Sequence, residues 1–283
     1  MRILMTGANG QLGCELRRVF ASETLILKDL PEFDLSGLRI EEDVVGARPD
    51  LIIHAGAYTD VDGAEREPER AMAINASGTA QVARAAARVG ARLLYISTDY
   101  VFPGTQRHPY SEADAPAPVN AYGLSKWRGE QAVAESGADA LIVRTAWLYG
   151  AMGKNFVKSI MRAALTQPSL RVVDDQRGSP TSVEDLASVI KATATGSMQG
   201  ILHVTNRGDC TWCEFARAIV EAMNLDISVL PISTTEAGRL APRPAYSVLG
   251  QQRLARLDLA PRDWREALNQ FVKAEQALVT VHP

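Results

Sequence analysis

Short apolar runs separated by longer amphipathic segments fill the first half of the chain. Each run is continuous rather than alternating in polarity, as expected of a strand that helices cover on both faces. The runs lie at residues 2–5, 25–27, 51–53, 93–96 and 141–143. Helical spacing occurs between them, at residues 12–20, 75–89 and 121–134. This order predicts strand–helix units that build an α/β fold with a doubly wound parallel sheet.

The later chain continues the pattern less regularly. Further elements are predicted there, with strands at residues 170–173 and 201–204 and helices at 182–194 and 211–223. Beyond them we expect shorter elements and more loops, because prolines interrupt the chain at Pro231, Pro242, Pro244 and Pro261. We therefore predict two domains. Residues 1–149 form the first, with both later strands interleaved into its sheet, and residues 150–283 form mainly a smaller α/β domain.

Composition excludes several classes of function. With 283 residues and 46% hydrophobic side chains the chain can bury a sizeable core, and its formal net charge of −3 leaves no overall basic surface for nucleic acid or an anionic membrane. The apolar stretch at the N-terminus is too short for a signal peptide. No later run approaches the roughly 20 apolar residues that a membrane span needs. We expect a cytoplasmic protein.

The three cysteines point the same way, since an odd number cannot all pair within one chain and fits a reducing compartment. Cys210 and Cys213 do have the spacing of half a redox or zinc site. No second cysteine pair accompanies them, however, and Thr211 with Glu214 matches a capping box that opens a helix. We predict a helix start at this segment rather than a metal site.

A glycine-rich segment follows the first predicted strand and opens the first predicted helix. Gly7, Gly10 and Gly13 have the spacing G-x-x-G-x-x-G, a variant of the dinucleotide-binding turn of Rossmann folds. Glycine lets the chain turn tightly and lets its backbone approach a pyrophosphate, whose charge the helix N-terminus favours. The segment predicts a dinucleotide site, and the alternative is a tight turn without a ligand.

The end of the second predicted strand bears on the choice of dinucleotide. Asp29 lies 16 residues beyond Gly13, where a carboxylate can accept hydrogen bonds from the adenosine ribose of NAD. Lys28 beside it could instead meet the extra phosphate of NADP. The sequence leaves both open, together with the plainer reading of a solvated Lys-Asp turn.

Candidate chemistry centres on Tyr122 and Lys126, which are four residues apart and therefore share one face of a helix. Tyrosine has an ordinary pKa of about 10, so acid–base work at neutral pH needs a nearby positive charge, which Lys126 supplies. Such a pair alone is usually a solvated helix face. Thr98 strengthens the functional interpretation, because it follows the fourth apolar run, where strand ends face the ligand crevice.

Together these segments resemble the extended short-chain dehydrogenase/reductase family, and within it most closely the dTDP-4-dehydrorhamnose reductases. The resemblance covers nearly the whole chain. The motifs that carry it lie at residues 7–13, 57–59, 61–62, 64–65, 97–104, 122–126, 144–149, 155–156, 175–181 and 243–244. Matches in the last third separate this group from general epimerases of sugar nucleotides.

The resemblance implies an enzyme that uses NADPH or NADH to reduce the C4 ketone of dTDP-4-dehydro-β-L-rhamnose to dTDP-β-L-rhamnose, the last step in making that sugar donor. Tyr122 would protonate the C4 oxygen, Lys126 would hold the nicotinamide ribose and lower the tyrosine pKa, and Thr98 would hydrogen-bond the reacting region. Residues 150–283 would mainly bind substrate. Open alternatives are another nucleotide-sugar 4-ketoreductase or epimerase of this fold, and a non-catalytic regulatory subunit.

The resemblance also implies binding residues. The catalytic set is Thr98, Tyr122 and Lys126. The cofactor set is Gly7, Gly10, Gln11, Leu12, Gly13, Asp29, Asp34, Leu35, Ala57, Tyr58, Thr59, Tyr122 and Lys126. The substrate set is Val61, Thr98, Asp99 and Trp147, although a tryptophan could equally belong to the core. Arg243 is expected at the substrate diphosphate, for which a guanidinium is suited.

Some members of the family dimerise through a magnesium ion. The counterparts of its ligands here would be Glu15, Glu184 and Asp185. Three carboxylates on helix surfaces are more often solvated, so we predict no metal site and treat Mg2+ at a dimer interface as the alternative. The expected partner is a dTDP-sugar, without nucleic acid or membrane, and the expected state is a monomer or homodimer.

Overall fold

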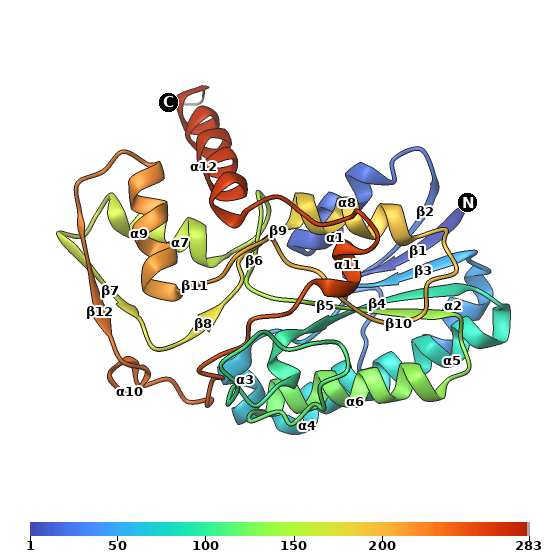
Figure 1. Cartoon of the computed structure of the whole chain (residues 1–283). Helices are drawn as coiled ribbons and strands as arrows, with labels where there is room; N and C mark the ends of the chain where they lie inside the picture. Colours follow the sequence, from blue (N-terminus) through green and yellow to red (C-terminus); the bar gives the residue numbers. More distant parts are fainter. Residues whose placement is uncertain (282–283) are drawn as a thin grey trace.

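A six-stranded parallel sheet lies at the centre of the computed structural model, which describes residues 1–281 (Figure 1). Its strands are β1 (Arg2–Thr6), β2 (Thr24–Lys28), β3 (Leu51–His54), β4 (Arg92–Thr98), β5 (Ala140–Thr145) and β10 (Gly200–His203). They lie in the order β10-β5-β4-β3-β1-β2, and all neighbours are parallel. All five strands predicted in the first half are confirmed. Every residue of β3 and β4 is buried, which explains why their apolar runs are continuous.

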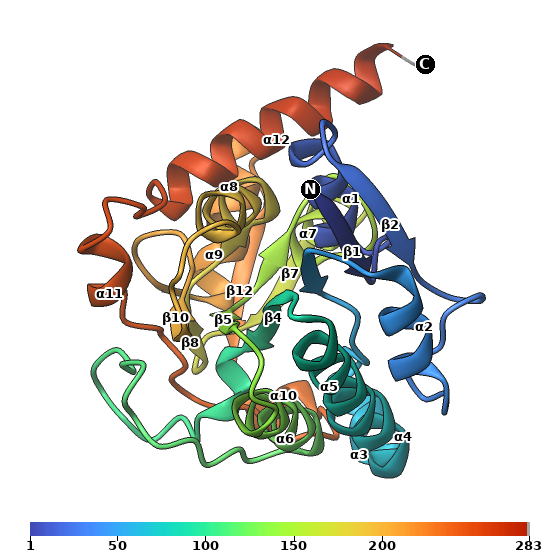
Figure 2. The same ribbon diagram turned by 90° about the vertical axis from the view of Figure 1, so that its right-hand side faces the viewer.

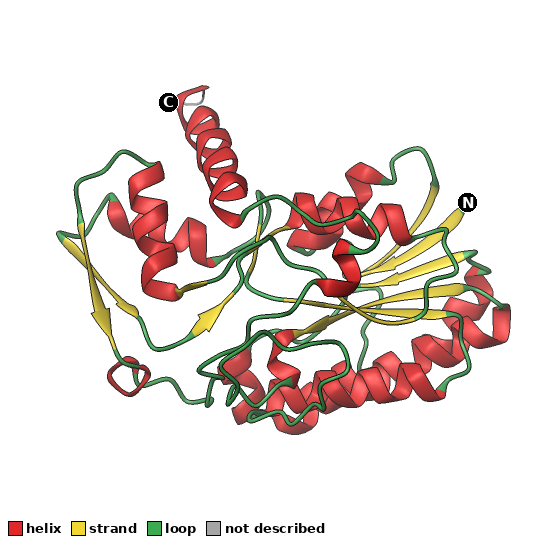
Figure 3. Cartoon of the chain, viewed as in Figure 1, coloured by secondary structure: helices red, strands yellow, loops and turns green. Residues whose placement is uncertain are grey.

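Helices cover both faces of this sheet (Figure 3). On one face lie α1 (Gln11–Val19) and α8 (Val183–Thr193), whose buried residues share one apolar core with β1 and β5. On the other lie α2 (Ile40–Ala47), α5 (Thr79–Val89) and α6 (Ala121–Glu135). The predicted doubly wound α/β fold is therefore confirmed. Its strand order reverses at β1 and β3, where ligands bind in such sheets.

A second group of elements packs around its own apolar core (Figure 1, left). Strand β7 (Ser169–Val173) pairs in parallel with β12 (Ser228–Ile232), and α7 (Phe156–Ala164), α9 (Trp212–Ala222) and α12 (Trp264–Val281) lie beside them. The expectation that residues 170–173 join the central sheet is wrong, whereas Gly200–His203 does join it. The reason is visible at Arg171, which is exposed between two buried residues, so β7 has only one covered face. The division of the chain at residue 149 stays a prediction.

The last third of the chain is more helical than expected. Helix α12 has 18 residues and is the longest of the described helices (Figure 2), and α7 was also not anticipated. Pro261 lies in the loop three residues before α12 begins, so this proline does not interrupt a helix. No described helix is both long and apolar enough to cross a membrane.

Several short elements complete the description. They are α3 (Val61–Arg66), α4 (Pro68–Met72), the π-helix η1 (Ala73–Gly78), the 3-10 turn η2 (Asp99–Val101), α10 (Thr234–Ala237) and α11 (Gln252–Ala255). The two-residue strands β6 (Leu148–Tyr149) and β9 (Thr181–Ser182) pair with each other, as do β8 (Arg177–Gly178) and β11 (Cys210–Thr211).

Helix α1 packs closely against the turn that precedes it, and substitution of Gly13 tests this packing. A Cβ on Gly13 would lie 2.1 Å from the carbonyl oxygen of Gly7, whereas a Cβ on Gly46, in α2, meets nothing within 4 Å. We expect Gly13→Ala to lower the free energy of unfolding by about 1–3 kcal/mol through overpacking. Gly46→Ala should raise it by up to about 1 kcal/mol, because alanine is the better helix former. Urea denaturation of both variants checks this, and equal stability of the two would contradict it.

Candidate active site

A cavity of about 620 Å3 lies at the carboxyl ends of the central strands. Apart from Arg243, every residue predicted to be catalytic, to bind cofactor or to bind substrate lines it. The cavity thus brings together segments from Gly7 to Trp147 that are distant in sequence. This placement agrees with one shared site, while the role of each residue stays a prediction.

The glycine turn forms one wall of the cavity. Gly7 has φ +67°, and a Cβ on it would lie 2.6 Å from the backbone nitrogen of Gly56 in the neighbouring loop. Helix α1 begins at Gln11, and no side chain forms a cap at Gly10 before it. Its first backbone N–H groups therefore have no side-chain acceptor, which is the donor set that an anionic phosphate group needs. The residues present fit a dinucleotide pyrophosphate.

Asp29 supports this turn from the end of β2. Its Oδ2 accepts from the backbone N–H of Asn9 at 2.7 Å, and its Oδ1 accepts from Leu30 N–H at 2.8 Å. Lys28 also lines the cavity, with its Nζ 5.4 Å from the ring centroid of Phe33. This end of the cavity therefore carries both a carboxylate and an ammonium group.

The neighbouring loop carries Asp34 and Leu35, and both line the cavity. Asp34 Oδ1 accepts from the backbone N–H and the hydroxyl of Ser36, at 2.8 and 2.7 Å. These hydrogen bonds, the backbone one first, lower the pKa of Asp34. The carboxylate thus hydrogen-bonds within its own loop, and this local turn fixes the backbone of the loop that lines the cavity.

The segment Ala57–Thr59 is held by a residue that sequence reasoning missed. Asn75, in the π-helix η1, accepts from Tyr58 N–H at 2.8 Å and donates to Tyr58 O at 2.9 Å. The same amide group donates to the Ser125 hydroxyl at 2.9 Å, next to Lys126 on α6. The only signal in the sequence was an asparagine within an alanine-rich helical run. π-Helical turns are frequent at functional sites, and here the turn coincides with the residue that clamps the loop.

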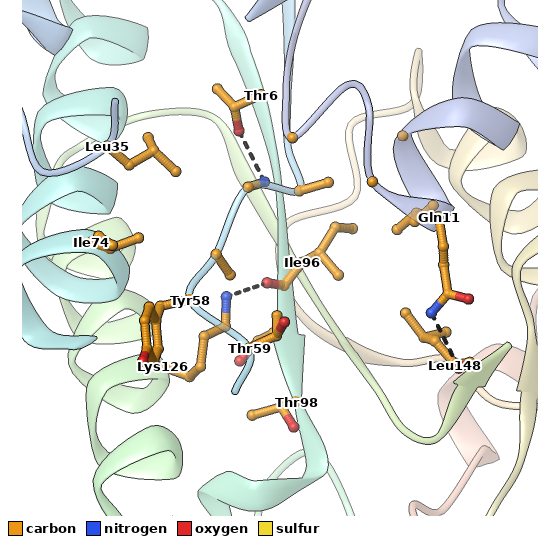
Figure 4. A pocket seen from close by; sticks show the side chains of 18 of the residues that line it. Thr6, Gln11, Leu35, Tyr58, Thr59, Ile74, Ile96, Thr98, Lys126 and Leu148 are labelled. Carbon is orange, nitrogen blue, oxygen red and sulfur yellow. Dashed lines mark hydrogen bonds between the residues drawn. The ribbon is translucent and has the colours of Figure 1, made fainter. Parts of the chain in front are cut away.

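Lys126 reaches back from α6 to the central sheet. Its Nζ donates to the carbonyl oxygen of Ile96 on β4 at 2.7 Å (Figure 4). The same atom lies 4.2 Å from the ring centroid of Tyr95, also on β4. The side chain is buried. Burial lowers the pKa of Lys126 to about 7, and the negative charge of Glu130 opposes that shift.

Tyr122 lines the cavity one helical turn before Lys126. Burial raises its pKa to about 12, a hydrogen bond with Thr98 opposes the shift, and the charge of Asp99 adds to it. In the protein alone, desolvation of the phenolate determines the direction of this shift, and the lowering of the tyrosine pKa by Lys126 stays a prediction. A raised pKa keeps the hydroxyl protonated at neutral pH, and a proton donor must start in that state.

The ends of β4 and β5 present polar groups without partners. Burial raises the pKa of Asp99 to about 6, against hydrogen bonds from Ser247 and Thr98. Its Oδ1 accepts from the Thr98 hydroxyl at 3.0 Å, but its Oδ2 and the hydroxyl of Thr145 have no partner among the described residues. Both residues line the cavity. Both atoms are themselves buried, so the unpaired groups lie within the wall of the cavity.

The wall opposite α6 is aromatic. Trp147 has φ +48°, a conformation rare for a bulky residue, and stacks on Trp212 with ring centroids 3.5 Å apart and planes at 10°. A Cβ on Gly178 would lie 2.6 Å from the Trp147 ring, so only glycine leaves room for this indole. Both indoles line the cavity, and sequence reasoning missed Trp212.

Trp212 is the first residue of α9, directly after the predicted helix start. Thr211 Oγ1 accepts from Glu214 N–H at 3.0 Å, and Glu214 Oε2 accepts from Thr211 N–H at 2.8 Å. The predicted capping box is therefore confirmed. Cys210 and Cys213 are buried and unpaired. The capping box fixes the start of α9 and thereby places the Trp212 indole in the cavity wall.

Gln11 connects the glycine turn to the later part of the chain. Its side-chain amide donates to Leu148 O at 3.2 Å (Figure 4), and its Oε1 accepts from Asn155 at 3.2 Å. The cavity is therefore closed by contacts between segments more than 130 residues apart, which bring Trp147 over the end of the sheet.

Arg243 does not line the cavity. Its guanidinium donates to Asp62 Oδ1 at 3.1 Å and to Ala241 O at 2.7 Å. Its expected contact with a substrate diphosphate stays a prediction. The guanidinium ties the loop after α10 to α3.

The three carboxylates considered for magnesium each meet an arginine. Glu15 pairs with Arg18 at 2.5 Å, and Asp185 and Glu184 pair with Arg262 at 3.0 and 3.7 Å. Over the part of the chain that the structure describes, no three histidine, cysteine or carboxylate side chains are grouped as a metal site would need. Arginine charges thus already balance these carboxylates.

Comparisons with known proteins agree with this site. The family model described as "RmlD substrate binding domain" matches residues 1–277. A dTDP-4-dehydrorhamnose reductase of Mycolicibacterium smegmatis is 42% identical, covering 100% of this chain and 88% of that protein. The spore coat polysaccharide biosynthesis protein SpsK of Bacillus subtilis is 41% identical, covering 96% and 97%. The crystal structure of dTDP-4-dehydrorhamnose reductase from Bacillus anthracis in complex with NADP has a TM-score of 0.92 and 44% identity, covering 95% and 98%.

A buried histidine beneath the site makes stability depend on pH. His54 lies between two threonines, with Nδ1 2.6 Å from Thr6 Oγ1 and Nε2 2.9 Å from Thr79 Oγ1. Burial, and then the charge of Lys126, lower the pKa of His54 to about 3, against an ordinary value of 6.5. Below about pH 6.5, His54 therefore binds a proton in the unfolded chain but stays neutral in the folded chain. The stability that neutral His54 contributes is present above that pH and is lost as the pH falls towards 3.

We expect His54→Gln to destabilise the protein most at pH 7. Its deficit in unfolding free energy relative to the parent should shrink by up to about 1.4 kcal/mol per unit as the pH falls from 6 to 4. Urea denaturation across this range measures the deficit. His108→Gln, which makes the same change at an exposed position, is the matched control. A deficit for His54→Gln that is constant with pH would exclude this linkage.

Proposed function

Because the chain belongs to the RmlD substrate binding domain family, we propose that it is an NAD(P)H-dependent oxidoreductase. The reaction is reduction of the C4 ketone of dTDP-4-dehydro-β-L-rhamnose to dTDP-β-L-rhamnose, the last step in making that sugar donor. One observation carries the proposal: Thr98, Tyr122 and Lys126 line the same cavity as the uncapped start of α1. A relative that carries the name of this reductase aligns with the whole chain.

The chemistry needs a hydride and a proton. When bound, a reduced nicotinamide supplies the hydride to the ketone carbon. Tyr122 gives its hydroxyl proton to the C4 oxygen, so the carbonyl becomes an alcohol and charge balances. Thr98 hydrogen-bonds the reacting region and Tyr122. Lys126 holds the nicotinamide ribose, and its positive charge stabilises the tyrosinate that remains after proton transfer.

The cofactor residues divide by the part of the dinucleotide they would meet. Gly7 to Gly13 would hold the pyrophosphate at the α1 N-terminus, and Asp29 with Lys28 would meet the adenosine ribose and its substituent. Asp34, Leu35 and Ala57–Thr59 would line the rest of this half of the cavity. The B. anthracis structure contains NADP, and we propose NADPH or NADH for this chain.

The remaining wall would take the sugar nucleotide. Val61, Asp99 and Trp147 lie towards the catalytic set, and Trp212 extends the aromatic surface. We also propose a cytoplasmic location, because all three cysteines are unpaired. A monomer or homodimer without nucleic acid completes the proposal.

Tyr122→Phe tests the mechanism. Loss of the proton donor should lower kcat by about 100-fold or more, while the Kd for NADPH should stay within a few-fold of the parent. Consumption of NADPH with dTDP-4-dehydrorhamnose measures kcat, and Tyr246→Phe, outside the cavity, is the matched control.

Full activity of Tyr122→Phe would remove this residue from the mechanism. Interconversion of sugars without net consumption of NADPH would indicate an epimerase. Binding of NADPH with no turnover of any 4-keto nucleotide sugar would favour a regulatory subunit.

A further inference from the structure

The positive charge of Lys126 is buried without an ion pair. Its Nζ donates to Ile96 O, and among the described residues no carboxylate lies within the 4.0 Å of a salt bridge. The other close group is the face of Tyr95, whose ring centroid is 4.2 Å from Nζ. An aromatic face carries partial negative charge and attracts a cation most strongly where water is excluded.

Tyr95 cannot move away from this contact. It is fully buried, and its ring stacks on His54 with centroids 5.4 Å apart and planes at 23°. Its hydroxyl donates to the backbone oxygen of Lys126 at 3.4 Å. A Cβ on Gly129 would lie 2.4 Å from that hydroxyl oxygen, so glycine lets α6 approach the ring. The ring is thus fixed beneath the lysine that it faces.

We propose that the aromatic face of Tyr95 keeps Lys126 protonated and directed into the cavity, so that Tyr95 is a positioning residue for the reduction. This inference rests on the function proposed above. A carboxylate at this place would pair with the ammonium group and take up its N–H donors. An aromatic face stabilises the charge without accepting a directed hydrogen bond at a single atom. One N–H is used by Ile96 O, and the remaining ones stay available to a ribose.

Other groups that face Lys126 do not replace this contact. On α6 these are Tyr122, one turn before, and Glu130, one turn after. Both oxygens of Glu130 are occupied by the guanidinium of Arg144, at 2.8 and 2.6 Å, and one also accepts from Ser97 at 2.6 Å, so Glu130 acts on Lys126 through its charge, which raises the lysine pKa, and not through a direct contact. On β3, behind the Tyr95 ring, His54 is neutral at physiological pH.

The protonation of Lys126 is therefore sensitive to its neighbours. Burial brings its pKa to about 7, close to neutral pH. A modest loss of stabilisation would then leave the lysine uncharged in much of the population. Because charged lysine is the active form, the decline of activity at alkaline pH would then begin at a lower pH.

The test keeps the shape of the ring and changes only its charge. Phenylalanine at position 95 is compared with phenylalanines carrying one, two and three fluorine atoms, which withdraw charge from the ring face stepwise. We expect the alkaline limb of the kcat profile to move to lower pH with each fluorine, by about one pH unit over the series. The KM for the sugar nucleotide should change little. The same series at Tyr149, a tyrosine buried in the other core, is the matched control.

A second measurement does not depend on turnover. The chain has six lysines, so labelling lysine at Cε with 13C allows Lys126 to be titrated by NMR and assigned with a Lys126→Met variant. Its pKa should fall along the series at position 95 and stay constant along the series at position 149. A constant pKa at position 95 would overturn the role of Tyr95. A falling pKa in a protein without reductase activity would support that role and refute the proposed function instead.

Discussion

The hydrogen bond from Lys126 Nζ to the carbonyl oxygen of Ile96 is the contact on which the site depends. It ties α6 to β4 across the dry interior, where a charge is costly unless it finds polar partners. Close packing makes it possible. Cβ atoms on Gly123 and Gly129 would lie 2.1 Å from Tyr100 O and 2.4 Å from Asn75 O, so glycines let the helix lie flat on its neighbours. Tyr122 is placed at the cavity as a consequence.

Two further constraints complete the cavity. The parallel sheet puts the carboxyl ends of its strands at one edge, so the turn at Gly7 and the hydroxyl of Thr98 face the same space. Contacts from the later chain then close that space. Gln11 binds Leu148 O, and Trp212 stacks on Trp147. The cavity is thus lined by residues of the central sheet and of the later chain.

Much of the fold could be predicted because its strongest signals are local. Strands β1 to β5 and helices α1, α6 and α8 follow from continuous apolar runs and helical spacing. The placement of β7 could not be predicted from its apolar residues alone, since pairing with β12 depends on which face Arg171 leaves exposed. Helix α12 was not predicted, because the prolines before it indicated a region of loops. The π-helix η1 interrupts what looked like one helix, because turn type depends on packing against the neighbouring loop.

The sequence by itself determined the five strands in the first half of the chain, the glycine turn, the Tyr122–Lys126 pair and the capping box at Thr211, because each depends on residues close together in the chain. Only the tertiary structure decided the partners that come from elsewhere, namely Asn75 beneath Tyr58, Tyr95 beneath Lys126 and Trp212 against Trp147. It also decided the direction of the pKa shift of Tyr122. Spacing suggested a lowered value, but desolvation depends on everything packed around the hydroxyl, and burial raises it.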